Sequence, residues 1–273
     1  MRYLRLLIIL SFFVLKDNQA NESDKIIAHG TYLISSIHKD GIMVASDSRI
    51  AFFHIEKTGR TLIAYRDSFP KTFIIGKNTL SYSGNATLLN VFISTIINEY
   101  KKTLKEDTLN IKYLLPSFFS FVKTKYNLNF SQMIFSGILI TSGYDSLKPR
   151  IFYYQKVDGI QEMNYNYQSI AESGKSNFRK KASSNLSCEQ AGEIAVDVIN
   201  EYAISNNKTD IIGGPVEICK VTKDSVVVIK NKLPKFKWVY MKDYISDLKS
   251  HKTKMFFTSA ENEKKFYEHY DKN

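Results

Sequence analysis

Runs of hydrophobic residues in this chain come mostly in pairs separated by short polar turns, a pattern that predicts antiparallel β-hairpins. The first pair covers residues 31–37 and 42–46, and Lys39-Asp-Gly joins the two runs. Asp-Gly between two β-prone runs is the strongest short-range signal for a hairpin. The same pattern recurs further along the chain, and a lone strand is expected over 163–168. The later pairs are 71–75 with 79–83, 133–141 with 150–155 around a turn at Gly143, and 216–222 with 226–229.

Three other segments place apolar residues at helical spacing. The pattern predicts helices over 86–104, 111–126 and 188–203. Ser187 and Gln190 form a capping-box sequence at the start of the third helix, whose apolar stripe is expected to face the core. The order of strands, helix pair, strands, helix and strands indicates an α+β fold with antiparallel sheets sandwiched between helices.

Composition and charge narrow the range of functions. The chain has 273 residues, of which 44 % are hydrophobic and 13 % aromatic, as in an ordered globular protein of one large or two small domains. The net charge of +11 comes from scattered lysines without an arginine cluster, so nucleic acid is not an expected partner. A basic protein that binds anionic surfaces is an alternative that rests on this charge alone.

The two cysteines and the absence of a Gly-rich phosphate loop limit the chemistry. Two cysteines are too few for a disulfide framework or a thiolate zinc cluster, and no metal or cofactor is expected. Cys188 and Cys219 either pair in an oxidising compartment or remain two small buried thiols; the sequence leaves both alternatives open.

The first twenty residues are typical of a signal peptide. Arg2 and Arg5 precede a ten-residue, largely apolar run, residues 6–15, which is too short to cross a bilayer as a helix. Export, to the outside or to a periplasm, is therefore predicted, and no other apolar run approaches membrane length. The alternatives are a buried N-terminal strand and a cytoplasmic protein.

Four segments carry motifs that occur together, and in this order, in one known family. They are residues 29–49, from His-Gly-Thr to Val-Ala-Ser-Asp-Ser-Arg; 66–75 with Leu-Ser-Tyr-Ser-Gly at 80–84; Ile-Ala-Glu-Ser-Gly at 170–174; and 212–224, which begins Ile-Gly-Gly-Pro. Together they resemble proteasome β subunits. These are N-terminal nucleophile hydrolases whose mature chain begins with a Thr that follows a Gly, and they generally work in rings.

This resemblance implies a domain plan and a fold. A signal peptide at 1–20 and a propeptide at 21–30 would precede a proteasome-like domain at 31–229, a four-layer αββα sandwich. Residues 230–273, hereafter the C-terminal extension, are basic and rich in aromatic residues, and are expected to pack on the body or on a neighbouring subunit.

The resemblance also implies a catalytic site for hydrolysis of a peptide or other amide substrate. After cleavage between Gly30 and Thr31, the Thr hydroxyl would attack and its own α-amino group would act as the base. A lysine and an aspartate would tune this pair, a glycine N–H would stabilise the oxyanion, and a serine and a second aspartate would hold the amine. The residues on these motif positions are Thr31, Asp47, Lys71, Gly84, Ser173 and Asp210.

The sequence departs from the family pattern in three places. Ile212 stands where a serine usually precedes the Gly-Gly pair, and Asp210 is displaced by about one residue. Lys71 comes about eight residues late, which predicts a longer hairpin over 51–65. These departures keep a second interpretation open, a catalytically inactive relative with a structural or binding role.

Overall fold

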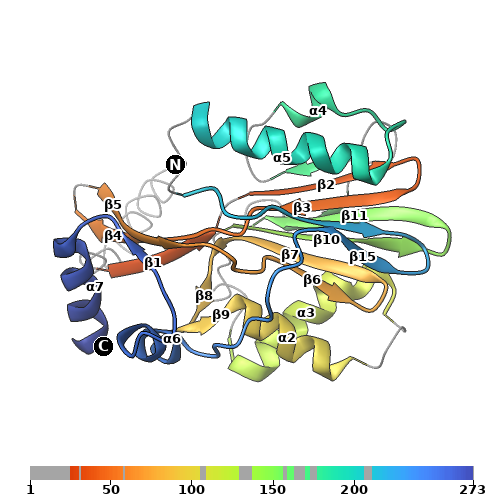
Figure 1. Cartoon of the computed structure of the whole chain (residues 1–273). Helices are drawn as coiled ribbons and strands as arrows, with labels where there is room; N and C mark the ends of the chain where they lie inside the picture. Colours follow the sequence, from red (N-terminus) through yellow and green to blue (C-terminus); the bar gives the residue numbers. More distant parts are fainter. Residues whose placement is uncertain are drawn as a thin grey trace, which may run out of the picture.

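The computed structural model describes residues 25–30, 32–57, 59–104, 109–128, 137–155, 159–162, 170–172, 177–205 and 211–272. Within them, two β-sheets lie face to face and helices cover their outer faces (Figure 1). Side chains from both sheets, among them Leu33, Val44, Ile140 and Ile151, form the core between them. The structure confirms the α+β class and the layered sandwich.

The smaller sheet has the order β13-β2-β3-β14-β15. Its strands are β13 (Ile170–Glu172), β2 (Leu33–His38), β3 (Gly41–Ser46), β14 (Glu217–Val221) and β15 (Val226–Lys230). The Asp-Gly hairpin (β2–β3) and the closing pair (β14–β15) are therefore where the hydrophobic pattern predicts them. Helices α4 (Phe178–Lys181) and α5 (Cys188–Ser205) cover this sheet (Figure 1).

The larger sheet has the order β12-β11-β10-β7-β1-β4-β5-β16, and β6 also pairs with β7. Its central strands are β10 (Gly137–Asp145), β7 (Asn78–Asn85), β1 (Lys25–Gly30), β4 (Ile50–Glu56) and β5 (Gly59–Arg66). The outer strands are β12 (Gly159–Glu162), β11 (Lys148–Gln155), β16 (Phe256–Phe257) and β6 (Thr72–Ile75). Helices α2 (Ile93–Thr103) and α3 (Ile111–Tyr126) cover its outer face. The longer hairpin expected over 51–65 is the β4–β5 pair.

Two local predictions differ from the structure. The helix expected from residue 86 begins only at Ile93, because a small hairpin, β8 (Thr87–Leu88) and β9 (Val91–Phe92), turns at two residues with positive φ, Leu89 and Asn90. The turn expected at Gly143 lies at residues 146–147 instead, where Ser146 has a φ of 58°. The lone strand expected over 163–168 falls outside the described residues.

The C-terminal extension packs on the body of its own chain. It forms α6 (Met241–Lys249), β16 and α7 (Ala260–Lys272), and β16 pairs with β5. Its aromatic residues join an apolar cluster with β1, β4, β5 and the loop before α2. The buried members from the extension are Trp238, Met241, Tyr244, Ile245, Leu248 and Phe266.

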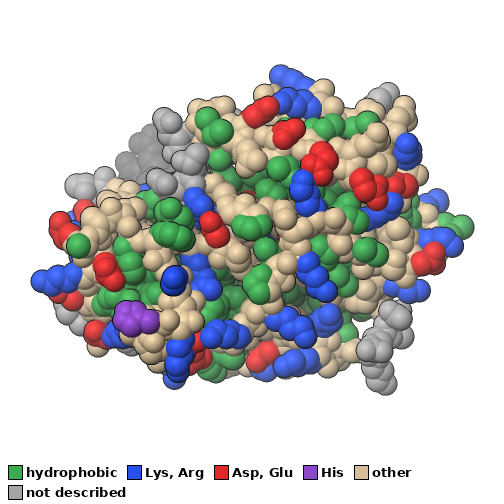
Figure 2. Space-filling model, in the orientation of Figure 1, with side chains coloured by type: hydrophobic (Ala, Val, Ile, Leu, Met, Phe, Trp, Pro, Cys, Tyr) green, Lys and Arg blue, Asp and Glu red, His purple; other side chains and the backbone are tan. Residues whose placement is uncertain are grey.

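Four further features predicted from the sequence can be compared with the structure: the cap of α5, the two cysteines, the distribution of charge and membrane-spanning segments. The N–H of Ser187 donates to Gln190 Oε1 at 2.9 Å, and the N–H of Gln190 donates to Ser187 Oγ at 3.2 Å, so the predicted capping box is present at α5. Cys188 and Cys219 are buried, and neither forms a disulfide. On the face drawn in Figure 2, basic side chains lie at many places among acidic and apolar ones. No helix in the described part of the chain is long and apolar enough to cross a membrane.

Candidate active site

A buried ion pair joins two of the sequence-predicted site residues. Asp47 directly follows β3, and Lys71 directly precedes β6. Lys71 Nζ lies 2.5 Å from Asp47 Oδ1, and the two side chains are only 1 % and 0 % exposed. Because burial disfavours charge, it lowers the pKa of Lys71, against the opposing attraction of Asp47. Removing either partner would therefore leave an uncompensated charge in the interior.

Asp47 also ties together segments that are far apart in the sequence. Its Oδ1 accepts a hydrogen bond from the N–H of Tyr32 at 2.9 Å, and its Oδ2 accepts from the N–H of Gly213 at 3.2 Å and of Arg49 at 3.3 Å. With Lys71, at least four donors among the described residues bind the carboxylate, as is usual for a buried polar group. Asp47 thus fixes the backbone of the residue that follows Thr31.

Gly84, predicted from the sequence as a site residue, lies opposite β1 in the larger sheet. It lies near the end of β7 with a φ of 112°, a conformation that L side chains rarely adopt. In the register of β7 with β1, Gly84 stands opposite Gly30. The backbone of Gly84 is therefore next to the peptide unit that self-processing would cleave.

The structure does not place the other three predicted residues. Thr31, Ser173 and Asp210 lie outside the described residues, although Gly30 and Tyr32, on either side of Thr31, are described. Ile212, which replaces the expected serine, is buried in the apolar cluster beneath α5 together with Tyr32. At this position the chain has a core contact in place of a hydroxyl.

A second ion pair packs against the two glycines at 213–214, close to Asp47. Arg49 donates to Asp67 through Nε at 2.6 Å and Nη2 at 2.9 Å. Gly214 has a φ of 71°, and a Cβ there would come within 2.6 Å of Ser48 Oγ. Arg49 and Asp67 belong to the quoted motifs, but their pairing across 18 residues has no signal in the sequence.

Residues 25–30, expected to belong to a propeptide, form a strand inside the larger sheet. All six residues of β1 pair with β4, and its last two pair with β7. The N–H of Ala86 donates to the carbonyl of Ala28 at 2.8 Å. The hairpin β4–β5 is thus joined to the rest of its sheet through β1.

His29 makes the seating of β1 dependent on pH. Burial, and then the charges of Arg60 and Lys71, lower its pKa from 6.5 to about 4. Between pH 6.5 and about 4, His29 binds a proton when β1 is detached from the sheet but not when β1 is paired in it. The pairing of β1 with the sheet therefore weakens as pH falls from 6.5 to about 4. We expect the protection of the amides of residues 25–30, which is the slowing of their exchange relative to that of an unstructured peptide at the same pH, to fall over this range. The His29→Gln chain should show no such loss of protection; an equal loss in both chains would contradict the prediction.

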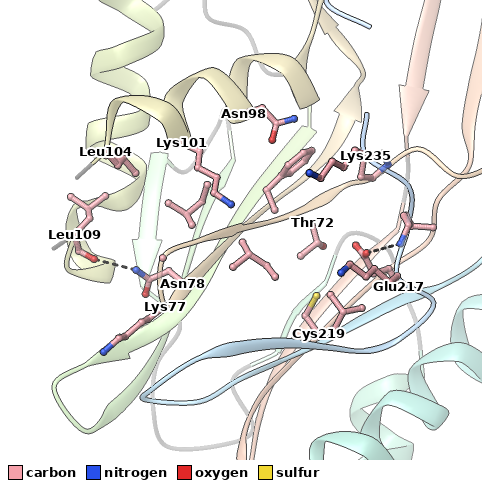
Figure 3. A pocket seen from close by; sticks show the side chains of 18 of the residues that line it. Thr72, Lys77, Asn78, Asn98, Lys101, Leu104, Leu109, Glu217, Cys219 and Lys235 are labelled. Carbon is pink, nitrogen blue, oxygen red and sulfur yellow. Dashed lines mark hydrogen bonds between the residues drawn. The ribbon is translucent and has the colours of Figure 1, made fainter. Parts of the chain in front are cut away.

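A basic cleft of about 1110 Å³ has Pro70 and Thr72 in its lining, the residues on either side of Lys71, but neither Asp47 nor Lys71 itself. It runs between the β6–β7 hairpin, the end of α2, and the segment after β15; Figure 3 shows Lys101 and Glu217 on opposite sides of it. Among the described residues that line it, Glu217 is the only carboxylate, and none is a predicted site residue. Its lysines are Lys77, Lys101, Lys102, Lys223, Lys232 and Lys235.

Comparison with known proteins decides the family. The family described as Proteasome subunit matches residues 27–221, well over half of the chain. The chain belongs to the proteasome subunit family. The whole C-terminal extension, part of which packs on β1, lies beyond the matched residues.

Solved structures give the same fold. This proteasome subunit resembles Anbu from Hyphomicrobium sp. strain MC1, both as a Gly-1 mutant (TM-score 0.52) and in a second structure (TM-score 0.50); each is 14 % identical and covers 81 % of this chain and 93 % of the other. Anbu from Yersinia bercovieri, described as an ancestral beta-subunit, has 17 % identity, a TM-score of 0.49, and coverage of 81 % and 95 %. At these identities the likeness concerns the fold alone. A search of curated proteins finds no match.

Proposed function

We propose that this proteasome subunit is a self-processing threonine hydrolase that cleaves peptide or other amide bonds. One arrangement carries the proposal: Asp47 binds both Lys71 and the N–H of Tyr32, while Gly84 stands opposite Gly30. Two groups to which the proposal gives roles in the reaction thus contact or face the residues on either side of Thr31, namely Tyr32 and Gly30. This arrangement supports the proposal.

The proposed chemistry has two stages. In processing, the Thr31 hydroxyl attacks the carbonyl carbon of Gly30, the C–N bond breaks, and its nitrogen takes up the hydroxyl proton to become the free α-amino group of Thr31. Water then hydrolyses the resulting ester, which releases the segment that ends at Gly30 and restores the hydroxyl. In turnover, this amine takes the proton of the attacking hydroxyl and passes it to the leaving amine of the substrate, and water then hydrolyses the acyl-enzyme. Ser173 and Asp210 would hold the amine, and the Gly84 N–H would stabilise the oxyanion.

The charge of Lys71 supports this cycle. An α-amino group titrates with a pKa of about 8 in water, and a neighbouring positive charge favours its neutral, basic form. The same charge stabilises an alkoxide on the threonine. The charge of Lys71 already contributes to the lowered pKa of His29, two residues before Thr31.

The first test is the mature N-terminus of the protein isolated from its native host. We expect intact mass and N-terminal sequencing to find a chain that begins at Thr31, because signal removal after Ala20 and self-cleavage after Gly30 both precede activity. A chain beginning at Asn21 would support export and contradict self-processing. A chain beginning at Met1 would contradict both.

The position of β1 favours a second candidate, a non-catalytic subunit. β1 pairs along its whole length with β4 and also with β7, as expected of a strand that stays in the mature protein. In that case Thr31 keeps its peptide bond and has no free amine. The N-terminal analysis separates the two candidates, since only the hydrolase loses β1 from its polypeptide chain.

A further inference from the structure

The position of β1 defines where a substrate must bind, if the proposed function holds. The segment that precedes Thr31 and contains β1 is called the leader below. Self-cleavage requires the carbonyl of Gly30 to lie at the nucleophile. Any other substrate presents its own carbonyl to the same group. The residues that precede a substrate's cleaved bond must therefore take the place that β1 occupies before processing.

The space between β4 and β7, which β1 occupies, can accept the backbone of an extended chain. β4 pairs with β1 from Lys25 to Gly30 on one side, and Ala86 and β7 bind it on the other. Main-chain hydrogen bonds of this kind are available to any extended peptide, whereas alternate side chains determine which peptide fits. Specificity must then arise from the side-chain environment on the two faces of β1.

The two faces of β1 differ sharply. Ile26 and Ala28 are 7 % and 4 % exposed and belong to the apolar cluster that contains the helices of the C-terminal extension. Ile27 and His29 point to the other face and are only partly buried. One face of the strand is thus fully enclosed and the other only partly.

The wall of the enclosed face is aromatic. Ala28 stands opposite Phe52 of β4. The ring of Phe52 stacks on Tyr244 of α6 with centroids 6.2 Å apart, and meets Phe266 of α7 edge to face at 5.5 Å. Both rings of the extension are fully buried, and α7 also packs against β1 itself. Figure 1 shows α6 and α7 gathered at the end of the sandwich where β1, β4 and β5 lie.

We propose that the C-terminal extension builds two apolar subsites, which take the third and fifth side chains before the cleaved bond of an extended peptide substrate. Ala28 and Ile26 occupy these subsites in the unprocessed chain. A small apolar side chain fits the third position, beside Phe52, and a larger one fits the fifth. A carboxylate at either position would lose its hydration without gaining a partner.

Peptide substrates test the subsites without altering the protein. The processed protein is given Ile-Ile-Ala-His-Gly coupled to a fluorogenic amine, the sequence of residues 26–30, and versions in which Asp replaces one residue. We expect Asp at the third or fifth position before the bond to lower kcat/KM by about tenfold or more, and Asp at the fourth, the matched control, by less than about twofold. Equal losses at the fourth and fifth positions would overturn the subsites and leave the proposed function intact.

Hydrogen exchange tests the same contacts independently of activity. In the full-length Thr31→Ala chain, which is expected to keep its leader, Ile26→Asp should accelerate amide exchange in residues 25–30 and in α7 by about tenfold or more. Ile27→Asp, on the partly exposed face, should accelerate exchange in both segments far less. If no peptide is hydrolysed, the proposed function fails. Independently of hydrolysis, equal exchange rates in the Ile26→Asp and Ile27→Asp chains would overturn the enclosure of β1 by the extension.

Discussion

Replacing Thr31 by alanine is expected to abolish amide hydrolysis and to leave the leader attached to the chain. The methyl group of alanine cannot attack a carbonyl, so neither the Gly30 peptide bond nor a substrate bond can form the ester. We expect kcat/KM to fall by about a thousandfold or more, as when a covalent nucleophile is removed. Hydrolysis of a fluorogenic peptide and intact mass spectrometry, on the same preparation, measure the two effects.

Two further variants make the result specific. Thr31→Ser keeps a hydroxyl and should retain both processing and part of the activity. Thr61→Ala removes an exposed threonine of β5 and should match the wild-type chain. Full activity in Thr31→Ala would assign the hydrolysis to another group and refute the mechanism.

Replacing Lys71 by methionine is expected to destabilise the protein by about 3–5 kcal/mol, because Asp47 then remains charged and buried without its cation. The matched control is Lys112→Met, which breaks the ion pair with Asp145, in which the lysine is 48 % exposed. An exposed pair of this kind contributes about 1 kcal/mol or less. Denaturant titration of the two variants gives the comparison.

The double variant Lys71→Met with Asp47→Asn separates stability from chemistry. Removing both charges eliminates the uncompensated carboxylate, so at least about half of the lost stability should return. Processing and hydrolysis should nevertheless remain absent, since the charge beside the amine is gone. If the double variant is active, the pair is structural only. If Lys71→Met lowers the free energy of unfolding by no more than Lys112→Met does, the Asp47–Lys71 pair is less isolated from water than its burial indicates.

The hydrophobic pattern predicted most of the sandwich because its signals are local. Asp-Gly at the β2–β3 turn and the Ser187–Gln190 cap act within a few residues, and both are present in the structure. The start of α2 was mispredicted because Leu88 and Leu89 continue its helical spacing. There, tertiary packing of Phe92 against the C-terminal extension favours a hairpin over that local preference.

The candidate site could be predicted only in part for a related reason. The motif positions identified Asp47 and Lys71, and the structure brings them together. The bond from Gly213 to Asp47 spans 166 residues and follows from no periodicity. The place of β1 was missed because a six-residue segment has too little pattern to reveal two sheet partners and a cover of helices. Pairings between distant segments are set by the assembled fold.

The contact between β1 and α7 has a consequence for how this protein is made. A ribosome synthesises β1 long before α7. The two can meet only after translation has passed the residues of α7, so until then a nascent chain holds β1 through its partners in the sheet. A product truncated before α7 therefore has a β1 strand that lacks its contact with this helix.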